Sequence, residues 1–271
     1  MDSSRPTISD NEFALFQRLI YRLAGISLSD AKRVLLVGRL GRRLEHHGLA
    51  SYSEYYRLLS SGNDPDEVQK MVDLLTTNET YFFREPQHFD FLRDLLRQEA
   101  GAGGPFRIWS GASSSGEEAY SMAMVLAEHC LQRPWEVFGS DISLTVLAKA
   151  RAGVYSQERI SGIPPACLRK YCLKGVRAQE GKLLIDSTLR QRVSFAQVNL
   201  TQPISGVGHF DVIFLRNVMI YFDVETKRRV IGNMLPCLKP GGHFIVGHAE
   251  SLNGLTDGLR TVRPTIYRKP G

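Results

Sequence analysis

The stretch from Phe106 to Tyr120, FRIWSGASSSGEEAY, constrains the fold of this chain more than any other. It begins with an apolar run typical of a strand, passes through a loop of glycine and serine, and resumes as a helix. This order is typical of the first nucleotide-binding unit of an open α/β sheet, where glycine lets the backbone approach a ligand. Small-residue loops also serve as plain turns, and that alternative stays open on this stretch alone.

Glu117 and Glu118 indicate which ligand fits the loop. Two carboxylates at the start of the helix would repel a pyrophosphate but attract an ammonium group. S-adenosylmethionine (AdoMet) carries an ammonium group and ribose hydroxyls. A second strand over residues 136–140 ends in Asp141, where this architecture binds ribose hydroxyls. Asp141 also suits a helix cap, which is the structural alternative.

Composition and charge argue against several other classes of protein. The net charge is +6, but lysine and arginine are dispersed among acids, so we predict no nucleic-acid partner. The four cysteines form no CxxC pair and the seven histidines show no metal-ligand spacing beside them, so we predict reduced thiols and no metal site. The chain starts without a signal sequence and has no run of about 18 apolar residues, so we expect a cytoplasmic protein without membrane insertion.

Residues 8–75 have the apolar periodicity of a small helical bundle. Ser9 or Asp10 begins the first helix and Gly25 ends it, and a second helix begins near Ser29. Two further helices are predicted over residues 52–59 and 66–75.

The helix that begins near Ser29, the second of the bundle, carries a basic cluster. At 100° per residue, Lys32, Arg39 and Arg43 fall within about 40° of one another on a helical projection. A docking surface for an acidic partner helix and an ordinary solvated face both fit this pattern.

The rest of the chain continues the α/β pattern. Strands are predicted over residues 193–198, 210–215 and 242–246, and the first two are followed by Asn199-Leu200 and Arg216-Asn217. Ligand-binding crevices need polar residues at such strand ends. We therefore predict a helical N-terminal domain (1–80), a connecting helix (86–98) and glycine-rich linker within 81–104, and an α/β domain (105–271). Residues 155–192 are expected to form a helix and a β-hairpin insertion.

Five segments together resemble one family. TTNETYFFRE, SGASSSGEEAYS, GSDIS, FLRNVMIYFD and LKPGGHFIVGHAESL, in this order, closely resemble the CheR family of chemotaxis receptor methyltransferases. The resemblance runs from about residue 10 to 269. It implies an α/β fold, in which a small all-helical N-terminal domain precedes a Rossmann-like class I AdoMet methyltransferase domain with a small antiparallel β insertion.

The resemblance also implies an activity and a set of site residues. The family's enzymes are protein-glutamate O-methyltransferases, which transfer methyl from AdoMet to glutamate carboxylates on cytoplasmic chemoreceptor helices and release S-adenosylhomocysteine. Arg84 and Tyr221 match its catalytic positions. Its AdoMet contacts match Asn78, Thr80, Arg84, Glu118, Asp141, Asn199, Leu200, Arg216 and Asn217. The structural alternatives are an ion pair between Arg84 and Glu85, and a core position for Tyr221.

Partners follow from the same resemblance. An acid-rich receptor helix would favour the docking role for Lys32, Arg39 and Arg43. In some members the β insertion binds a peptide from the receptor's C-terminus as an added strand. Here the loop from Lys174 to Gly181 is long enough, but it starts with one glycine where those members tend to have two. The rival interpretations are an AdoMet enzyme acting on RNA or a small molecule, and a catalytically silent AdoMet sensor.

Overall fold

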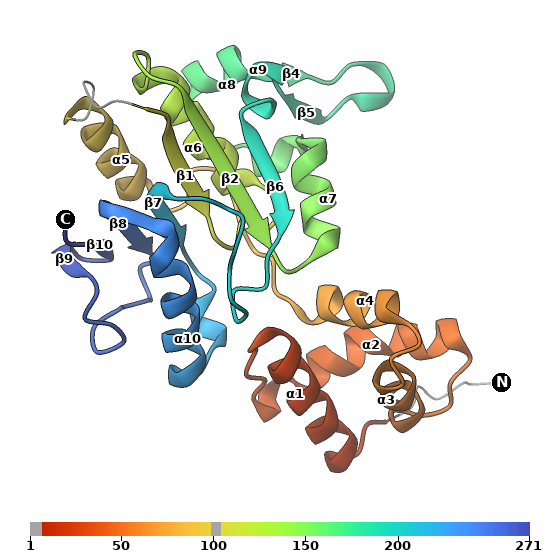
Figure 1. The fold of residues 1–271 in the computed structure, drawn as a ribbon. Coiled ribbons are helices and arrows are strands. Elements are labelled where there is room, and N and C mark those ends of the chain that lie inside the picture. The colour runs from red at the N-terminus through yellow and green to blue at the C-terminus, as the bar shows by residue number, and fades with distance from the viewer. Residues whose placement is uncertain (1–6, 99–103) are drawn as a thin grey trace. The chain divides into compact units, whose positions relative to one another are not determined.

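The computed structural model describes residues 7–98 and 104–271, which divide into two compact units (Figure 1). The first unit comprises the described residues up to Thr77 together with a later segment, Tyr221–Thr226, and the second contains the remainder. Residues 99–103, which include most of the predicted glycine-rich linker, lie outside the described part of the chain. Within that part, no helix combines the length and apolar character needed to span a membrane.

The first unit is helical, as predicted. Its elements are α1 (Asp10–Ala24), the 3₁₀ turn η1 (Asp30–Lys32), α2 (Arg33–His47), α3 (Tyr52–Ser60) and α4 (Pro65–Leu75). Ser9 caps α1 by accepting from the Glu12 N–H while the Glu12 carboxylate accepts from the Ser9 N–H, and Gly25 ends the helix at φ 70°. Both ends of α1 are therefore confirmed.

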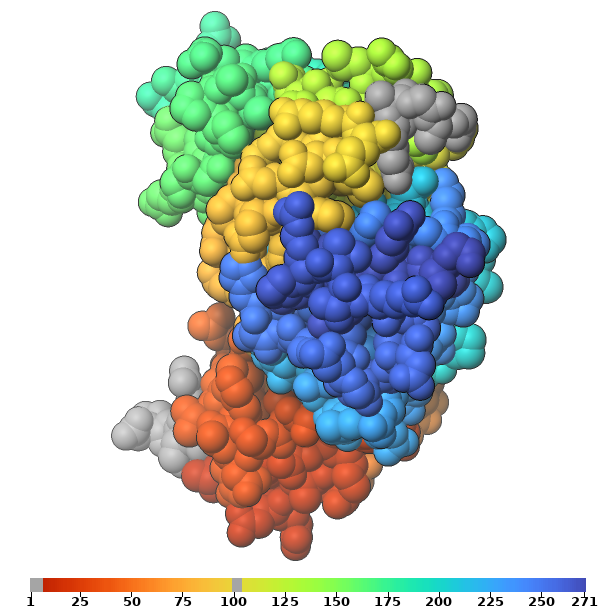
Figure 2. Space-filling view, turned by 90° about the vertical axis from the view of Figure 1, so that its left-hand side faces the viewer, coloured from red at the N-terminus to blue at the C-terminus, as the bar shows by residue number. Residues whose placement is uncertain are grey.

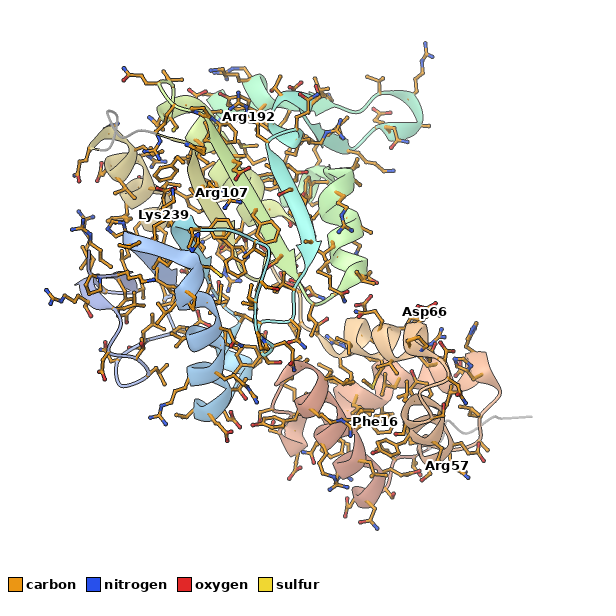
Figure 3. All side chains as sticks on the ribbon, viewed as in Figure 1. Phe16, Arg57, Asp66, Arg107, Arg192 and Lys239 are labelled. Atoms are coloured by element: carbon orange, nitrogen blue, oxygen red, sulfur yellow. The ribbon has the colours of Figure 1, made fainter. Side chains whose placement is uncertain are left out.

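Aromatic rings fill the core of this unit. Phe16 (Figure 3) is fully buried, and its ring centroid lies 6.1 Å from those of both Tyr52 and Tyr55. Tyr55 also donates a 2.8 Å hydrogen bond to Glu67, an acid with no exposed surface. Buried charges need partners, and Arg43 supplies one through Nε at 2.8 Å and Nη2 at 2.6 Å.

The structure shows where the three basic residues of the predicted docking surface lie. Arg43 is bound to Glu67, and Arg39 Nη1 donates to the carbonyls of Leu74 and Thr76 at the end of α4. Lys32 is exposed, but it lies in η1 before α2 begins, where the helical projection does not apply. Two of the three side chains therefore also join helices of this unit, and the docking role of the cluster stays a prediction.

The second unit is built on a mixed sheet with strand order β6-β2-β1-β7-β8-β10-β9. The strands are β1 (Phe106–Ser110), β2 (Trp135–Asp141), β6 (Val193–Gln197), β7 (Phe210–Leu215), β8 (Leu238–Val246), β9 (Arg260–Arg263) and β10 (Ile266–Arg268). The pairs from β6 to β8 are parallel, whereas β10 is antiparallel to both neighbours. The direction of strand addition reverses at β1, which places β2 and β7 on its two sides (Figure 1).

Helices α5 (Pro86–Gln98) and α6 (Glu117–His129) pack on the same sheet face. Ile108, Val137 and Val212 lie side by side in register on that face, within one buried cluster that also contains apolar residues of α5 and α6. On the opposite face, Trp109 packs against the rings of Phe138 and Phe210. Both faces of the parallel strands are thus covered, as expected for this architecture.

The predicted insertion is present with one more strand than expected. Strands β3 (Val154–Ser156), β5 (Lys182–Ile185) and β4 (Cys172–Lys174) form an antiparallel sheet in the order β3-β5-β4, with α8 (Pro165–Tyr171) preceding β4 and α9 (Ser187–Arg190) following β5. Residues 154–156 were not predicted as a strand because three residues carry too little periodicity.

Other element boundaries also differ from prediction. Helix α7 (Leu144–Ala152) is capped by Ser143 rather than Asp141. Helix α10 (Val224–Met234) ends four residues before the predicted Leu238, and β8 begins at Leu238, not at Gly242. The proline and glycines of β8 are accommodated by an irregularity in its pairing with β7. The C-terminal strands β9 and β10 were not predicted; they lie beside α5 on the surface shown in Figure 2.

Candidate functional site

The carboxyl ends of the parallel strands meet at one edge of the sheet. The ends of β1, β2, β6 and β7, with the segments that follow them, contain six of the nine sequence-predicted AdoMet residues. Strand order reverses between β1 and β7, which is where open α/β sheets bind their ligands. The topology therefore brings Glu118, Asp141, Asn199, Leu200 and Arg216 to the same edge.

The loop after β1 is held tightly against the neighbouring strands. The Gly111 N–H donates to the Phe214 carbonyl at 2.7 Å, and the Ser113 N–H donates to the Ser140 carbonyl at 2.8 Å. A Cβ at Gly111 would lie 2.7 Å from Met234 Cε, and Gly116 has φ 95°. Gly116 is therefore favoured by its backbone conformation, and Gly111 by close packing that also includes the Phe214 carbonyl oxygen 3.1 Å from such a Cβ.

Asp141 is fixed at the tip of β2 by two backbone donors. Its Oδ2 accepts from the Ser114 N–H at 3.0 Å and its Oδ1 from the Ser143 N–H at 2.9 Å. Each carboxylate oxygen has a further lone pair, which suits a pair of ribose hydroxyls. Ser114 also donates through Oγ to the Asn78 carbonyl, so it links two predicted AdoMet residues.

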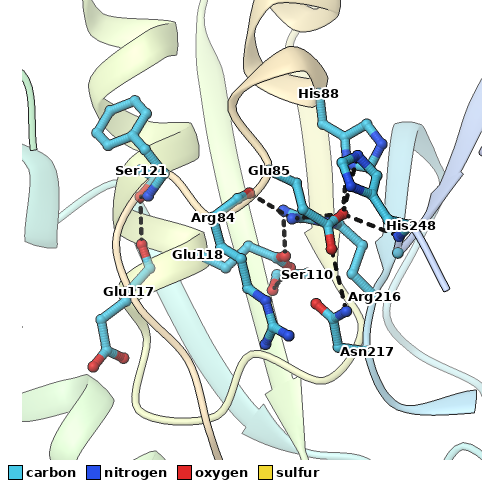
Figure 4. A network of polar contacts seen from close by, with 12 residues as sticks. Arg84, Glu85, His88, Ser110, Glu117, Glu118, Ser121, Arg216, Asn217 and His248 are labelled. Carbon is cyan, nitrogen blue, oxygen red and sulfur yellow. Dashed lines mark hydrogen bonds and ion pairs between the residues drawn. The ribbon is translucent and has the colours of Figure 1, made fainter. Parts of the chain in front are cut away.

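A charged network connects α6, the loop before α5 and the loop after β7 (Figure 4). Arg216 is buried, with Nη1 3.0 Å from Glu118 Oε2 and Nη2 3.1 Å from Glu85 Oε2. Nη2 also donates to the Arg84 carbonyl, and Ser110 Oγ donates to Glu118 Oε1 at 2.6 Å. Arg216 therefore holds the two acids in place.

The two acids differ in how well their charge is balanced. Burial would raise the pKa of Glu85, but Arg216, Asn217 and the His248 N–H together lower it. Burial raises the pKa of Glu118 above its usual value even though Arg216 acts in the opposite direction. A cationic ligand group beside Glu118 would offset that penalty. The ammonium group of AdoMet has the required charge.

Arg84 is the cation of this region that has no carboxylate partner among the described residues. It is half-buried, its Nη1 donates to the Glu79 carbonyl at 3.1 Å, and its guanidinium carbon lies 5.6 Å from the centroid of the Tyr81 ring. The alternative of an ion pair between Arg84 and Glu85 is wrong, because Glu85 pairs with Arg216.

The other predicted residues fall into three groups. Asn199 Oδ1 accepts from the Thr201 N–H and hydroxyl, and the Leu200 carbonyl accepts from Asn233. Thr80 is half-buried in the segment between Asn78 and Arg84. Tyr221 belongs to the first unit, where its carbonyl accepts from the Ser27 N–H at 2.9 Å.

Backbone strain concentrates around the network. Phe83 (φ 54°), Glu85 (φ 59°), Ser114 (φ 48°) and Asn217 (φ 59°) all have left-handed backbone conformations. Non-glycine residues adopt this region at a cost, and such residues cluster at ligand sites. These conformations place the Glu85 carboxylate beside Arg216, the Ser114 N–H beside Asp141 and the Asn217 N–H beside Glu250.

Sequence reasoning missed the residue that shapes the loop after β7. Glu250 is buried and accepts from the N–H groups of Asn217, Met219 and Gly247, each at 2.8 Å. An acid four residues after the end of β8 was the available signal. Ser110 and Ser114 were also missed as individual residues, because a serine in a loop gives no sign of its partner.

The comparisons with known proteins agree with this geometry. The profile described as "CheR methyltransferase, SAM binding domain" matches residues 78–268, and that described as "CheR methyltransferase, all-alpha domain" matches residues 11–76. The chain belongs to the CheR methyltransferase family. AdoMet is therefore its methyl donor and S-adenosylhomocysteine its product. The loop after β1 supports this assignment, because its Ser113 Oγ is buried and has no hydrogen-bond partner in the protein.

Curated relatives cover nearly the whole chain. A chemotaxis protein methyltransferase of Escherichia coli is 40% identical over 268 residues, covering 98% of this chain and 93% of the relative. Chemotaxis protein methyltransferase 2 of Pseudomonas aeruginosa is 41% identical over 259 residues, covering 94% and 92%. The chain is thus an AdoMet-dependent methyltransferase of chemotaxis. An N-methyltransferase, NodS, from Bradyrhizobium japonicum in complex with S-adenosyl-L-homocysteine matches with a TM-score of 0.43 at 17% identity, covering 76% of this chain and 98% of NodS.

Proposed function

We propose that this chain methylates glutamate side-chain carboxylates on the cytoplasmic helices of chemoreceptors, and that it does so in the cytoplasm. The observation that carries this proposal is that the Arg84 guanidinium, which hydrogen-bonds to the Glu79 carbonyl, forms no ion pair with a carboxylate among the described residues. Glu85 and Glu118 are both taken by Arg216, so the second cation of the network is left for an acid from outside. The chemotaxis relatives support a receptor as the source of that acid.

The chemistry of such a transfer needs few catalytic groups. A glutamate has a pKa of about 4.3, so its carboxylate is already nucleophilic near pH 7 and no general base is required. One carboxylate oxygen attacks the methyl carbon, the carbon–sulfur bond breaks, and its electron pair stays on sulfur. An anion and a sulfonium become a neutral ester and a neutral thioether. Water exclusion favours this step, and in-line positioning is the enzyme's main contribution.

Each site residue has a proposed role within this step. Arg84 draws in and orients the substrate carboxylate, while contact through only part of its guanidinium leaves one oxygen free to attack. Asp141 binds the ribose, Glu118 the ammonium group, and the segment Asn199-Leu200 the adenine edge. Tyr221 donates one hydrogen bond to the substrate carboxylate, an assignment supported by its place in the RNVMIYF motif.

The decisive experiment transfers labelled methyl from AdoMet to receptor-containing membranes and then releases methanol with mild alkali. We expect alkali-labile label on a receptor-sized band. Arg84→Ala should lower the transfer rate by about 100-fold or more, the range seen when a substrate loses its positioning. Arg169→Ala, which removes an exposed arginine of α8, is the matched control and should transfer normally.

Three outcomes would contradict the proposal. Near-normal turnover by Arg84→Ala that still binds AdoMet would remove Arg84 from catalysis. Alkali-stable label would mean that the acceptor is not a carboxylate, as for an enzyme acting on RNA or a small molecule. Binding of AdoMet without labelled product on any receptor tested would favour a silent sensor.

We also propose that the insertion sheet binds a receptor C-terminal peptide. Strand β4 pairs only with β5 in the order β3-β5-β4, and Leu173 and Val176 beside its outer edge are 52% and 71% exposed. An unpaired edge with apolar neighbours suits strand addition. Calorimetric titration with such a peptide should give saturable heat, which Leu173→Asp should abolish. No heat with the unaltered chain would refute this proposal.

A further inference from the structure

Three side chains outside the predicted AdoMet contacts converge beside the charged network. Glu85 precedes α5, His88 lies in its first turn, and His248 follows β8. One potential ligand atom from each lies within 4.8 Å of the other two. Figure 4 shows both imidazoles turned toward the Glu85 carboxylate. The sequence predicted no metal site, because His248 is far from the other two in the chain and no cysteine is involved.

His88 provides an imidazole nitrogen that is buried and unused. Its side chain is 1% exposed, and Nδ1 has no hydrogen-bond partner. Nε2 lies 2.8 Å from Thr265 Oγ1, and the Thr265 hydroxyl donates to the Pro264 carbonyl. When the Thr265 hydroxyl donates to the Pro264 carbonyl, Nε2 carries the imidazole proton and Nδ1 presents a lone pair, and this is the tautomer that binding of a metal ion at Nδ1 requires.

That lone pair faces another acceptor. His88 Nδ1 lies 3.4 Å from Glu85 Oε2, and with no proton on Nδ1 the two groups cannot hydrogen-bond. Two buried acceptors that face each other are stabilised by a cation between them. A nitrogen and an oxygen bound at about 2.1 Å to a tetrahedral ion would lie about 3.4 Å apart, which matches the spacing found.

His248 completes a three-residue ligand set. Its Nε2 is 3.9 Å from Glu85 Oε2, its ring centroid is 5.4 Å from that of His88, and its side chain is 54% exposed and free to adjust. Nδ1 of the same ring is 3.5 Å from Gln87 Nε2. Rotating the Gln87 amide would present its oxygen to a protonated Nδ1, the type of outer partner that metal-bound histidines have.

We propose that Glu85, His88 and His248 bind a divalent transition-metal ion of the zinc class. Two imidazoles and one carboxylate, with a fourth position open to water, form a ligand set that Zn²⁺ uses in proteins. The ion competes with Arg216, whose Nη2 is 3.1 Å from the same Glu85 oxygen. Metal binding is therefore coupled to the pair between Arg216 and Glu118, and through it to the AdoMet loop.

The test measures metal binding directly, on the full chain without a histidine tag. Zn²⁺ affinity is determined by competition with a chromophoric chelator, and Co²⁺ is added as a spectroscopic probe of coordination. We expect one ion per chain at micromolar or lower concentration, with the visible absorption of four-coordinate Co²⁺. His248→Gln should weaken the affinity at least 10-fold and remove that absorption. The exposed His209 supplies the matched control, His209→Gln, which should change neither.

A second variant separates loss of a ligand from loss of the fold. His88→Gln removes the Nδ1 ligand, and its far-UV circular dichroism shows whether the chain remains folded. A folded His88→Gln protein that binds Co²⁺ with an unchanged spectrum would overturn the proposal. So would a wild-type chain that binds neither ion below about 100 μM, an affinity too weak for a three-ligand zinc site, or equal losses in His248→Gln and His209→Gln.

Discussion

Replacing Glu67 with glutamine should lower the stability of the helical unit and leave that of the second unit unchanged. The Glu67 carboxylate has no exposed surface and accepts hydrogen bonds from Arg43 and Tyr55. Burial alone would raise its pKa, but these bonds and a contact from His47 lower it from 4.5 to about 2. At about 1.4 kcal/mol per pH unit, that difference corresponds to about 3 kcal/mol of folding free energy at neutral pH.

The sign of the pH dependence follows from the direction of the shift. Because the folded-state pKa lies below the unfolded value, the contribution is fully present above about pH 5 and is lost as the pH falls toward 2. Glu67→Gln should lack this part of the acid sensitivity. At pH 7 it should also be less stable by about 3 kcal/mol, since Arg43 is left without its buried partner.

The distribution of tryptophan makes the assay specific. Trp109 and Trp135 are the two tryptophans of the chain and both belong to the second unit. Urea unfolding is therefore followed by tryptophan fluorescence for that unit and by far-UV circular dichroism for the helices of both units, so that ellipticity lost outside the fluorescence transition reports the helical unit. With an m-value of about 1–2 kcal/mol per molar urea, the helical transition should move down by about 1.5–3 M while the fluorescence transition stays in place.

The matched control is Glu45→Gln, which neutralises an exposed acid on α2. It should leave both transitions within about 0.5 kcal/mol of wild type, as is usual for surface substitutions. The reasoning fails if Glu67→Gln is equally harmless. It also fails if wild type and variant lose helical stability in parallel between pH 5 and pH 2.

Further predictions concern the methyltransferase unit. Gly116→Ala should destabilise the tryptophan-reported transition by about 1–3 kcal/mol and weaken AdoMet binding, because φ is 95° and the new Cβ would lie 2.9 Å from Ala150 Cβ. Gly232→Ala, with open space around it on α10, should not destabilise that transition. Glu250→Gln should cost about 1.5–3 kcal/mol in the same urea titration, since it weakens charged hydrogen bonds to three backbone N–H groups; an unchanged midpoint would refute this. Micromolar Zn²⁺ should inhibit methyl transfer by wild type but not by His248→Gln, and a chelator should reverse the inhibition.

The sequence predicted correctly those elements whose bounds are set by residues close to them in the chain. Ser9 and Gly25 fixed both ends of α1, because a cap and a left-handed glycine act within one turn of the helix. Strand β7 was predicted at its true bounds, Phe210–Leu215, because an apolar run interrupted by Asp211 ends at Arg216. The polar residues at the strand ends lie at one edge of the sheet, because the carboxyl ends of parallel strands meet there.

The errors have a common cause in partners distant along the chain. The contacts of Arg39 with the end of α4 and of Arg43 with the buried Glu67 were missed, because these partners lie more than 20 residues further along the chain. The start of β8 depended on pairing with β7, which overrode a proline and two glycines. The roles of Glu250 as an anchor and His88 as a buried ligand candidate depend on groups brought near them only by folding.

The helical unit is discontinuous in the chain, and this has a consequence for biosynthesis. Residues 221–226 belong to it, with Asp223 accepting a 2.9 Å hydrogen bond from Tyr21. A chain made from its amino terminus cannot complete this unit until residue 226 has been added, by which time β1, β2, β6 and β7 are already made. Contacts of such sequence separation slow folding. The first unit to begin synthesis therefore cannot be completed before most of the sheet has been made, and chains that end before residue 221 should yield it incomplete.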